Sequence, residues 1–224
     1  MENPLCAGDD PDFRLIETFA YAPVLAGQNS SDKGVARLRL HLARLSRSAA
    51  AFGIPFDPNG VARLLAGLRG QEMLRCRLTL SATGTLELTT SAMPEAASSW
   101  VFAIAAERLD QADPYLRHKT TRRARYDRAR AHLPQGLQEL VFLNERDELC
   151  EGTITNIAVT TCDGVGLTPP LASGCLPGVF RQSLLDRGAL REAVLTLTDL
   201  QTARDVHLMN AVRGKIPAIL QAAG

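Results

Sequence analysis

The spacing of apolar residues divides the first half of the chain into one strand, two helices and a run of strands. Apolar and aromatic residues alternate from Phe13 to Tyr21, which predicts a half-buried strand. Between residues 35 and 52 the apolar positions recur every three or four residues, which predicts an amphipathic helix. A second helix is predicted at 60–68, and strands are predicted at 73–81, 85–91 and 100–107. This order is typical of an α+β domain with a largely antiparallel sheet.

A polar segment at 110–117, which contains Pro114, is interpreted as a linker between two domains. We therefore expect an N-terminal domain at 1–109 and a C-terminal domain at 118–224. In the second domain the same patterns predict helices at 120–132, 179–186 and 199–203, and strands at 140–144, 155–161, 166–168, 193–196, 206–209 and 216–220.

Composition and charge are those of an ordinary globular protein. Hydrophobic residues make up 46% of the 224 residues and the net charge is +1, so neither nucleic acid nor a membrane surface is indicated as a partner. The five cysteines have no C-x-x-C spacing and the four histidines are scattered, so no metal site is expected. Residues 1–12 resemble a loose acidic tail rather than a signal peptide, and no apolar run is long enough to span a membrane. We expect a cytoplasmic protein.

One lysine and one acid are the strongest candidates for chemistry. Lys119 stands in R-H-K-T-T-R-R-A-R-Y, a stretch that otherwise uses arginine for positive charge, and Glu151 follows in E-G-T-I-T-N. An amine that forms a Schiff base and an acid that keeps a pyridine nitrogen protonated are what an enzyme needs to use pyridoxal phosphate. Taken singly, Lys119 is better explained as a solvated lysine and Glu151 as part of a polar turn.

Three further segments have the chemistry of anion sites. The L-P-G-V-F-R stretch at 176–181 stands at the head of a predicted helix, where unpaired amides and the helix dipole favour a phosphate. Arg44 could clamp a phosphate with two parallel hydrogen bonds. In the turn at 210–214, backbone amides together with Arg213 could bind a carboxylate. The alternatives are a Pro-Gly turn, a solvated helix face and a turn that ends a strand.

Together these segments resemble the class IV aminotransferase family. The resemblance rests on H-L-A-R-L at 41–45, H-K-T-T at Lys119, E-G-T-I-T-N-I at Glu151 and T-P-P-L-A-S-G-C-L-P-G-V-F-R at 168–181, and it extends from about residue 15 to about residue 220. It implies a two-domain fold-type IV enzyme, similar to D-amino-acid aminotransferase. Such an enzyme has a small N-terminal α+β domain and a C-terminal mixed-sheet domain that binds pyridoxal phosphate.

The resemblance also implies roles for individual residues. Lys119 would bind the cofactor covalently and move the α-proton, Glu151 would pair with the pyridine nitrogen, and Arg44 would hold the phosphate. The remaining implied positions are Gly178, Val179 and Phe180 at the phosphate, Ala211 where many relatives have a hydroxyl, Leu176 on the ring face, Asn156 beside Glu151, and Tyr126, Val212 and Arg213 near the substrate.

Within the family, M-N-A-V-R-G-K-I-P-A at 209–218 is most similar to the 4-amino-4-deoxychorismate lyases. That branch implies conversion of a small molecule, 4-amino-4-deoxychorismate, to 4-aminobenzoate and pyruvate in folate biosynthesis. It further implies a homodimer, with aminodeoxychorismate synthase as a partner. The alternatives are an aminotransferase for branched-chain or D-amino acids, and a family member that has lost catalysis and serves as a binding or structural subunit.

Overall fold

The structure is a computed structural model that describes residue 5 and residues 10–23, 34–68, 72–96 and 98–221. The chain forms two compact units, one made of Met1–Glu95 with His118–Arg122, the other of Ala96–Arg117 with Arg123–Gly224. Most of the expected N-terminal tail and of the loop at 27–34 lies outside the described residues. The bounds of the two units differ from the expected domain ranges, so 1–109 and 118–224 stay a prediction.

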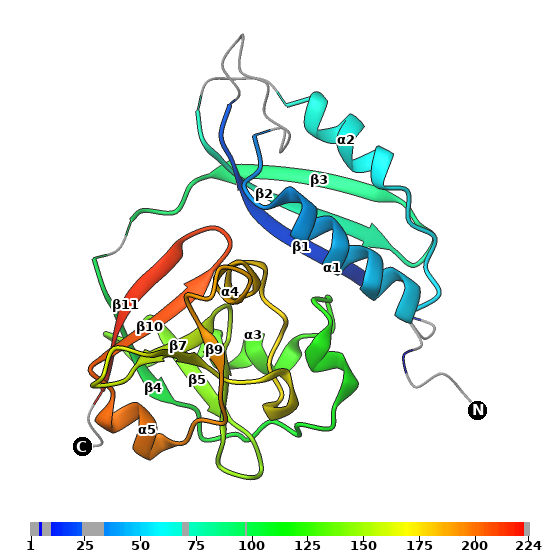
Figure 1. The fold of residues 1–224 in the computed structure, drawn as a ribbon. Coiled ribbons are helices and arrows are strands. Elements are labelled where there is room, and N and C mark those ends of the chain that lie inside the picture. The colour runs from blue at the N-terminus through cyan, green and yellow to red at the C-terminus, as the bar shows by residue number, and fades with distance from the viewer. Residues whose placement is uncertain (1–4, 6–9, 24–33, 69–71, 97, 222–224) are drawn as a thin grey trace. The chain divides into compact units, whose positions relative to one another are not determined.

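The first unit is built on a three-stranded antiparallel sheet in the order β1-β2-β3. Its strands are β1 (Arg14–Tyr21), β2 (Leu74–Ser81) and β3 (Leu86–Ala92) (Figure 1). Phe19 on β1 pairs with Cys76 on β2, and both side chains are buried. Gly84 forms the turn between β2 and β3 with a φ of 87°, a conformation that favours glycine. The predicted strands and the hairpin are confirmed here.

Two helices accompany this sheet, as the sequence predicts. The longer helix, α1 (Leu38–Ala51), packs on β1 and buries Leu38, Leu45 and Ala49 among others. The second, α2 (Pro58–Ala66), begins after Asp57, whose carboxylate accepts a hydrogen bond from the Asn59 amide at 2.9 Å. An acid at the N-cap followed by proline in the first turn explains why the helix begins there.

The segment around Lys119 runs alongside β1 in the first unit. The Ile16 amide donates to the Lys119 carbonyl at 2.8 Å, and the Thr121 amide donates to the Arg14 carbonyl at 2.9 Å. The predicted helix at 120–132 is therefore wrong in its first turn, because residues 119–121 use their backbone groups to pair with a strand. The helix α3 begins only at Ala124 and ends at Ala131.

The second unit is built around a mixed sheet in the order β10-β11-β4-β5-β6-β7-β8-β9. Because β10 also pairs with β7, the strands from β10 to β7 in this order form a closed ring. The strands are β4 (Trp100–Ile104), β5 (Glu139–Leu143), β6 (Leu149–Gly152), β7 (Asn156–Thr160), β8 (Gly166–Thr168), β9 (Arg191–Glu192), β10 (Asp205–Asn210) and β11 (Gly214–Leu220).

The core of the second unit is formed by apolar side chains from these strands together with Leu195 and Leu200. Its two further helices are α4 (Val179–Leu185) and α5 (Leu197–Thr202), both close to their predicted positions (Figure 1). Short 3₁₀ helices occur at Pro114–Arg117, inside the expected linker, and at Leu171–Ser173.

Three predictions about strands are wrong. The strand beginning at Trp100 belongs to the second sheet, where it pairs in parallel with β5 and β11. No strand occupies 193–196, because Thr196 instead caps α5 in a reciprocal arrangement with Asp199. The strand β6, which carries Glu151, is missing from the predicted strands.

Among the described helices, none combines the length and the apolar character needed to cross a membrane. Within the described ranges, no group of three or more His, Cys, Asp or Glu side chains is arranged to hold a metal ion.

Candidate active site

Glu151 and Asn156 face each other where β6 and β7 meet. The two residues are a register pair of the antiparallel strands, and each is only 6% exposed. All four residues of β6 are buried, so the strand carries its acid into the interior of the second unit. A buried carboxylate requires hydrogen-bond donors or a compensating charge.

Both oxygens of the Glu151 carboxylate accept hydrogen bonds. The Tyr126 hydroxyl on α3 donates to Oε1 at 2.7 Å, and the Leu176 backbone amide donates to Oε2 at 2.9 Å. Burial raises the pKa of Tyr126, and the negative charge of Glu151 raises it further, so the phenol stays protonated as a donor. The arrangement fixes the orientation of the carboxylate from two different elements.

Asn156 holds the loop that carries Leu176. Its Nδ2 donates to the Leu176 carbonyl at 2.9 Å, so both backbone polar groups of Leu176 are held, one by Glu151 and one by Asn156. Two residues further on, Gly178 is the N-cap of α4. A Cβ atom at Gly178 would lie 1.8 Å from Asn156 Oδ1, so only glycine leaves room for this amide.

We expect Gly178→Ala to lower the free energy of unfolding by about 2 kcal/mol, because Asn156 must give up its place beside Leu176. The matched control is the same substitution in an Asn156→Ala background, where the colliding amide is gone. Urea unfolding of the two single variants and the double variant measures the coupling. If the losses of unfolding free energy in the two single variants simply add in the double variant, the collision with Asn156 is not what destabilises Gly178→Ala.

A second buried acid, Glu139, shapes the turn between Glu151 and Asn156. Glu139 is fully buried on β5 and accepts hydrogen bonds from both the amide and the hydroxyl of Thr153. The Ile154 amide (3.2 Å) and the Thr155 hydroxyl (3.0 Å) donate to its other oxygen. The turn is therefore folded around a carboxylate, which fixes the two strand ends that present Glu151 and Asn156.

The turn at 211–213 is organised by Asn210. Asn210 Oδ1 accepts hydrogen bonds from the Val212 amide at 3.1 Å and the Arg213 amide at 2.9 Å. These are the amides that the sequence analysis assigned to a substrate carboxylate. In the structure they already donate to the Asn210 side chain, which would compete with a carboxylate for them. The Arg213 guanidinium lies over the Trp100 ring, 5.1 Å from its centroid, where a cation–π contact supports the side chain. Ala211 lies in the same turn, and it offers no hydroxyl.

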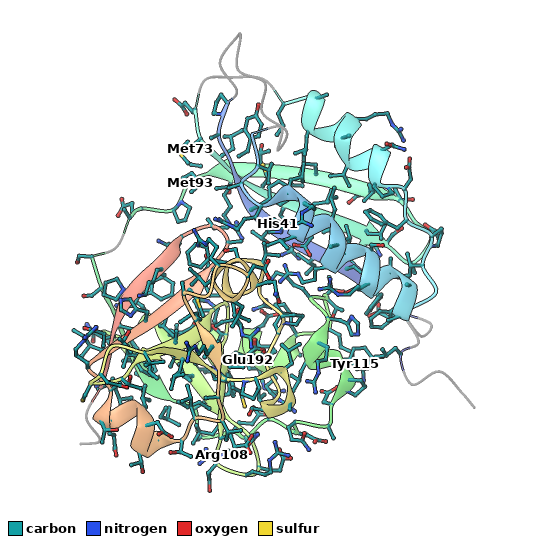
Figure 2. All side chains as sticks on the ribbon, viewed as in Figure 1. His41, Met73, Met93, Arg108, Tyr115 and Glu192 are labelled. Atoms are coloured by element: carbon teal, nitrogen blue, oxygen red, sulfur yellow. The ribbon has the colours of Figure 1, made fainter. Side chains whose placement is uncertain are left out.

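The loop at 169–178 and the first residues of α4 are held by a buried arginine. Arg181 is 1% exposed and donates to the Pro169 carbonyl at 2.7 Å and to Glu192, which Figure 2 labels. Val179 is buried at the start of the helix, and Phe180 packs with the cluster formed by Ala158, Leu190 and Met209. The helix start is thus fixed relative to the loop that carries Leu176.

Arg44, the expected phosphate ligand, belongs to a buried cluster in the first unit. Its guanidinium donates from Nε and Nη2 to the two oxygens of Glu17, at 2.8 and 2.7 Å. His41 Nδ1 lies 2.6 Å from Glu17 Oε2, and Figure 2 labels His41. Burial alone would raise the pKa of Glu17, but Arg44 and His41 outweigh it and hold the pKa at about 2. The pair fixes Arg44 in one orientation.

Lowering the pH should therefore decrease the free energy of unfolding, because Glu17 becomes protonated. Its folded pKa of about 2 lies below the ordinary 4.5, so its contribution is present above about pH 4.5 and is lost as the pH falls toward 2. We expect Glu17→Gln to lower the free energy of unfolding by about 3 kcal/mol at pH 7, and by progressively less through that window. Urea unfolding at pH 7 and pH 3 measures this, with exposed Glu87→Gln as the control. A difference that is independent of pH would contradict the assignment.

The structure thus brings together part of the expected site. In the second unit, Glu151, Tyr126, Asn156 and Leu176 are joined by hydrogen bonds, with Gly178 packed against Asn156. The other expected residues of this unit lie in α4 or in the turn at 211–213. Lys119, which is partly buried, and Arg44 belong to the first unit.

Sequence reasoning missed two features of this site. Glu139 was not singled out, although it is an acid placed directly before the apolar run L-V-F-L, and that contrast could have drawn attention to it. Tyr126 was expected near the substrate, and its bond to Glu151 could not be found from spacing, because the two residues come from a helix and a strand 25 positions apart.

Comparison with known proteins identifies the family. The pattern of the amino-transferase class IV family matches residues 22–219. The aminodeoxychorismate lyase of Saccharomyces cerevisiae is 33% identical over 136 residues, which cover 53% of this chain and 36% of that protein. A protein of Schizosaccharomyces pombe, provisionally named an aminodeoxychorismate lyase, is 27% identical over 191 residues, 80% of this chain and 82% of that protein. The chain thus spans about a third of the length of the first of these relatives.

Solved structures confirm the expected fold. A protein of Mesorhizobium loti, provisionally named an amino-acid aminotransferase, is 39% identical and superposes with a TM-score of 0.84, covering 94% of this chain and 100% of the other. The resemblance inferred from the sequence is therefore confirmed. The chain belongs to the class IV aminotransferase family, whose members are enzymes that depend on pyridoxal phosphate.

Proposed function

We propose that this chain is a pyridoxal-phosphate-dependent lyase that converts 4-amino-4-deoxychorismate to 4-aminobenzoate and pyruvate. The observation that carries the proposal is the buried Glu151, held on both oxygens, in a chain whose two curated relatives are named as aminodeoxychorismate lyases. We also propose that the enzyme works as a cytoplasmic homodimer in folate biosynthesis, with aminodeoxychorismate synthase as the supplier of its substrate.

The residues present fit the cofactor. Glu151 is supported by a phenol and an amide, which stabilise its negative charge without cancelling it. An anion of this kind is the partner that a protonated pyridine nitrogen needs. When bound, pyridoxal phosphate supplies an electron sink for the negative charge that develops at the amine-bearing carbon of the substrate. Leu176 would support the ring face, with its backbone fixed by Glu151 and Asn156.

The phosphate is assigned to Arg44 and to the backbone amides of Val179 and Phe180 that follow Gly178. An arginine supplies a planar fork of donors, and amides at a helix start supply further donors. Neither Phe180 nor Ala211 brings a hydroxyl. The proposal therefore places most of the phosphate binding on Arg44 and the two amides.

Lys119 is assigned the covalent and proton-transfer roles. Its amine would bind the cofactor, exchange with the amine of the substrate, and then remove the proton from the amine-bearing carbon. With that proton removed, the C–O bond at the neighbouring ring carbon would break, and the side chain would leave as enolpyruvate, which takes up a proton and becomes pyruvate. Loss of the proton and of this group would make the substrate ring aromatic, and 4-aminobenzoate would be released in exchange for the Lys119 amine.

Arg213 and the turn at 211–213 are assigned to the substrate. A substrate with two carboxylates favours a site with a guanidinium, and the Trp100 ring holds that of Arg213 in place. Val212 would contribute from the same turn. Tyr126, expected in this group from the resemblance, donates instead to Glu151 within the second unit.

An aminotransferase is the second candidate. It is favoured by the Mesorhizobium loti protein, which is more similar in sequence than either lyase and is provisionally named an amino-acid aminotransferase. Both reactions would use Lys119 and Glu151, and they would differ after the proton is removed. The lyase would eliminate a group from the neighbouring carbon, whereas the aminotransferase would return the proton to the cofactor.

The test is a turnover assay on protein reconstituted with pyridoxal phosphate and supplied with 4-amino-4-deoxychorismate. Equimolar release of 4-aminobenzoate and pyruvate supports the lyase. Protein that binds the cofactor but releases neither product, while transferring the amino group of a branched-chain or D-amino acid to a keto acid, supports the aminotransferase.

A further inference from the structure

The Tyr126 ring is held rigidly enough to aim its hydroxyl. It meets the Phe142 ring of β5 edge-on, with centroids 5.4 Å apart and an interplanar angle of 80°. The Arg123 guanidinium lies over its face at 5.8 Å, and the ring packs against the apolar cluster that includes Leu109 and Leu116. Contacts on its face and its edge leave the ring little freedom to rotate.

This packing leaves the hydroxyl in contact with the candidate site, where it donates to Glu151 Oε1 at 2.7 Å. The titratable and charged groups that act on the phenol include Glu151 and Cys150 of β6 and Arg125 of α3, and the Arg123 guanidinium lies over its ring. Burial and the charge of Glu151 both keep the phenol protonated. Glu151 therefore receives a strong neutral donor on one oxygen, while the Leu176 amide serves the other.

A neutral donor and a cationic donor affect a carboxylate differently. The Glu17 carboxylate of the first unit is bound by the Arg44 guanidinium, which cancels its charge. A phenol brings no charge, so it orients the carboxylate and leaves its negative charge to act on a third group. In the proposed enzyme that third group is the nitrogen of the pyridine ring.

We propose that Tyr126 is a positioning residue that acts through Glu151 to keep the ring nitrogen of the bound cofactor protonated. This inference rests on the proposed use of pyridoxal phosphate. Without the phenol, Oε1 of Glu151 would lose the Tyr126 donor, while Oε2 keeps the Leu176 amide. The carboxylate would be held less firmly, and its bond to a ring N–H would weaken.

The first test needs no cofactor. The protein has three tyrosines, so their ring carbons can be followed singly by ¹³C NMR. In the cofactor-free protein at neutral pH, Glu151→Gln should shift the Cζ signal of Tyr126 and leave those of the other two tyrosines in place, because the acceptor of the Tyr126 hydroxyl changes from a carboxylate to an amide. An unchanged Tyr126 signal would show that the contact does not exist in solution and would overturn the inference.

The second test follows the ring nitrogen itself. Protein loaded with pyridoxal phosphate labelled with ¹⁵N at the ring should give the signal of a protonated pyridine. In Tyr126→Phe the signal should move toward that of a neutral pyridine at the same pH, and kcat should fall about 10-fold with little change in KM. Tyr21→Phe, which removes a phenol at the end of β1, is the matched control and should behave as the native protein.

The outcomes separate the two claims. Native protein that binds no cofactor would overturn the proposed function, and the inference with it. Native protein that binds and turns over, while Tyr126→Phe keeps the native ¹⁵N signal and kcat, would overturn the inference alone. A Tyr126→Phe variant that loses activity only through unfolding would be recognised by its circular dichroism, and the NMR spectrum of the cofactor-free Glu151→Gln protein then decides.

Discussion

Lys119→Ala is expected to abolish the visible absorbance of lysine-bound pyridoxal phosphate and to reduce turnover by at least about 10³-fold. Covalent attachment of the cofactor and removal of the substrate proton are both assigned to this one amine, and alanine supplies neither. The substitution should leave the fold intact, because the Lys119 carbonyl, which accepts from the Ile16 amide, is a backbone group that alanine also has. Absorbance near the cofactor band and release of 4-aminobenzoate measure the two effects.

The chain provides matched controls, because it has only two other lysines. Lys215, exposed on β11, and Lys33 should each be replaceable by alanine with the absorbance and the rate unchanged. A small amine such as methylamine added to Lys119→Ala should restore part of the proton transfer. Full activity in Lys119→Ala, or loss of activity in Lys215→Ala, would show that the lysine has been assigned wrongly.

The second large effect is expected from Glu151→Gln. Glutamine has nearly the same shape, but it is neutral, and it can turn an N–H group toward the Tyr126 hydroxyl or the Leu176 amide, which are both donors in the native protein. Loss of a charge-assisted hydrogen bond of about 1.5–3 kcal/mol corresponds to a fall of about 10- to 150-fold in kcat. Steady-state kinetics on loaded protein give kcat and KM separately.

Glu87→Gln makes the same chemical change at an exposed position of β3 and should leave kcat unchanged. If Glu151→Gln raised KM alone, Glu151 would be a binding residue for the substrate rather than a partner of the ring nitrogen. Activity equal to that of the native protein would remove Glu151 from the site.

Elements with a regular pattern on one buried face could be predicted from the sequence. β1 alternates between the two faces of its sheet, and α1 buries residues at helical spacing, so both were located within a few positions. The turn at Gly84 and the N-cap at Asp57 follow from local chemistry alone. In each case the signal lies within about 15 consecutive residues.

The incorrect predictions of secondary structure share one cause, because at these positions the structure depends on pairing with segments far away in the sequence. β6 is buried along its whole length and contains Cys150, Glu151 and Gly152, so it has no alternation to detect. Residues 119–121 carry a helical pattern but pair with β1. The parallel neighbours of β4 come from positions nearly 40 and 120 residues later in the chain, and no feature of the sequence near β4 indicates this pairing.

The candidate site shows the same division. Glu151, Asn156, Leu176 and Gly178 could be named in advance because they resemble a known family, and the structure gives them their contacts. The two supporting residues, Tyr126 as a donor to Glu151 and Glu139 as the centre of a turn, depend on side chains that meet only in the folded chain.

The most direct test of the central claim is to locate the covalent link between protein and cofactor. Protein loaded with pyridoxal phosphate is reduced with borohydride, digested, and examined by mass spectrometry for the lysine that carries the added mass. We predict one modified lysine, Lys119, and loss of the modification when substrate is added before the reduction. A label on Lys33 or Lys215, or no label on protein that is nonetheless active, would contradict the account.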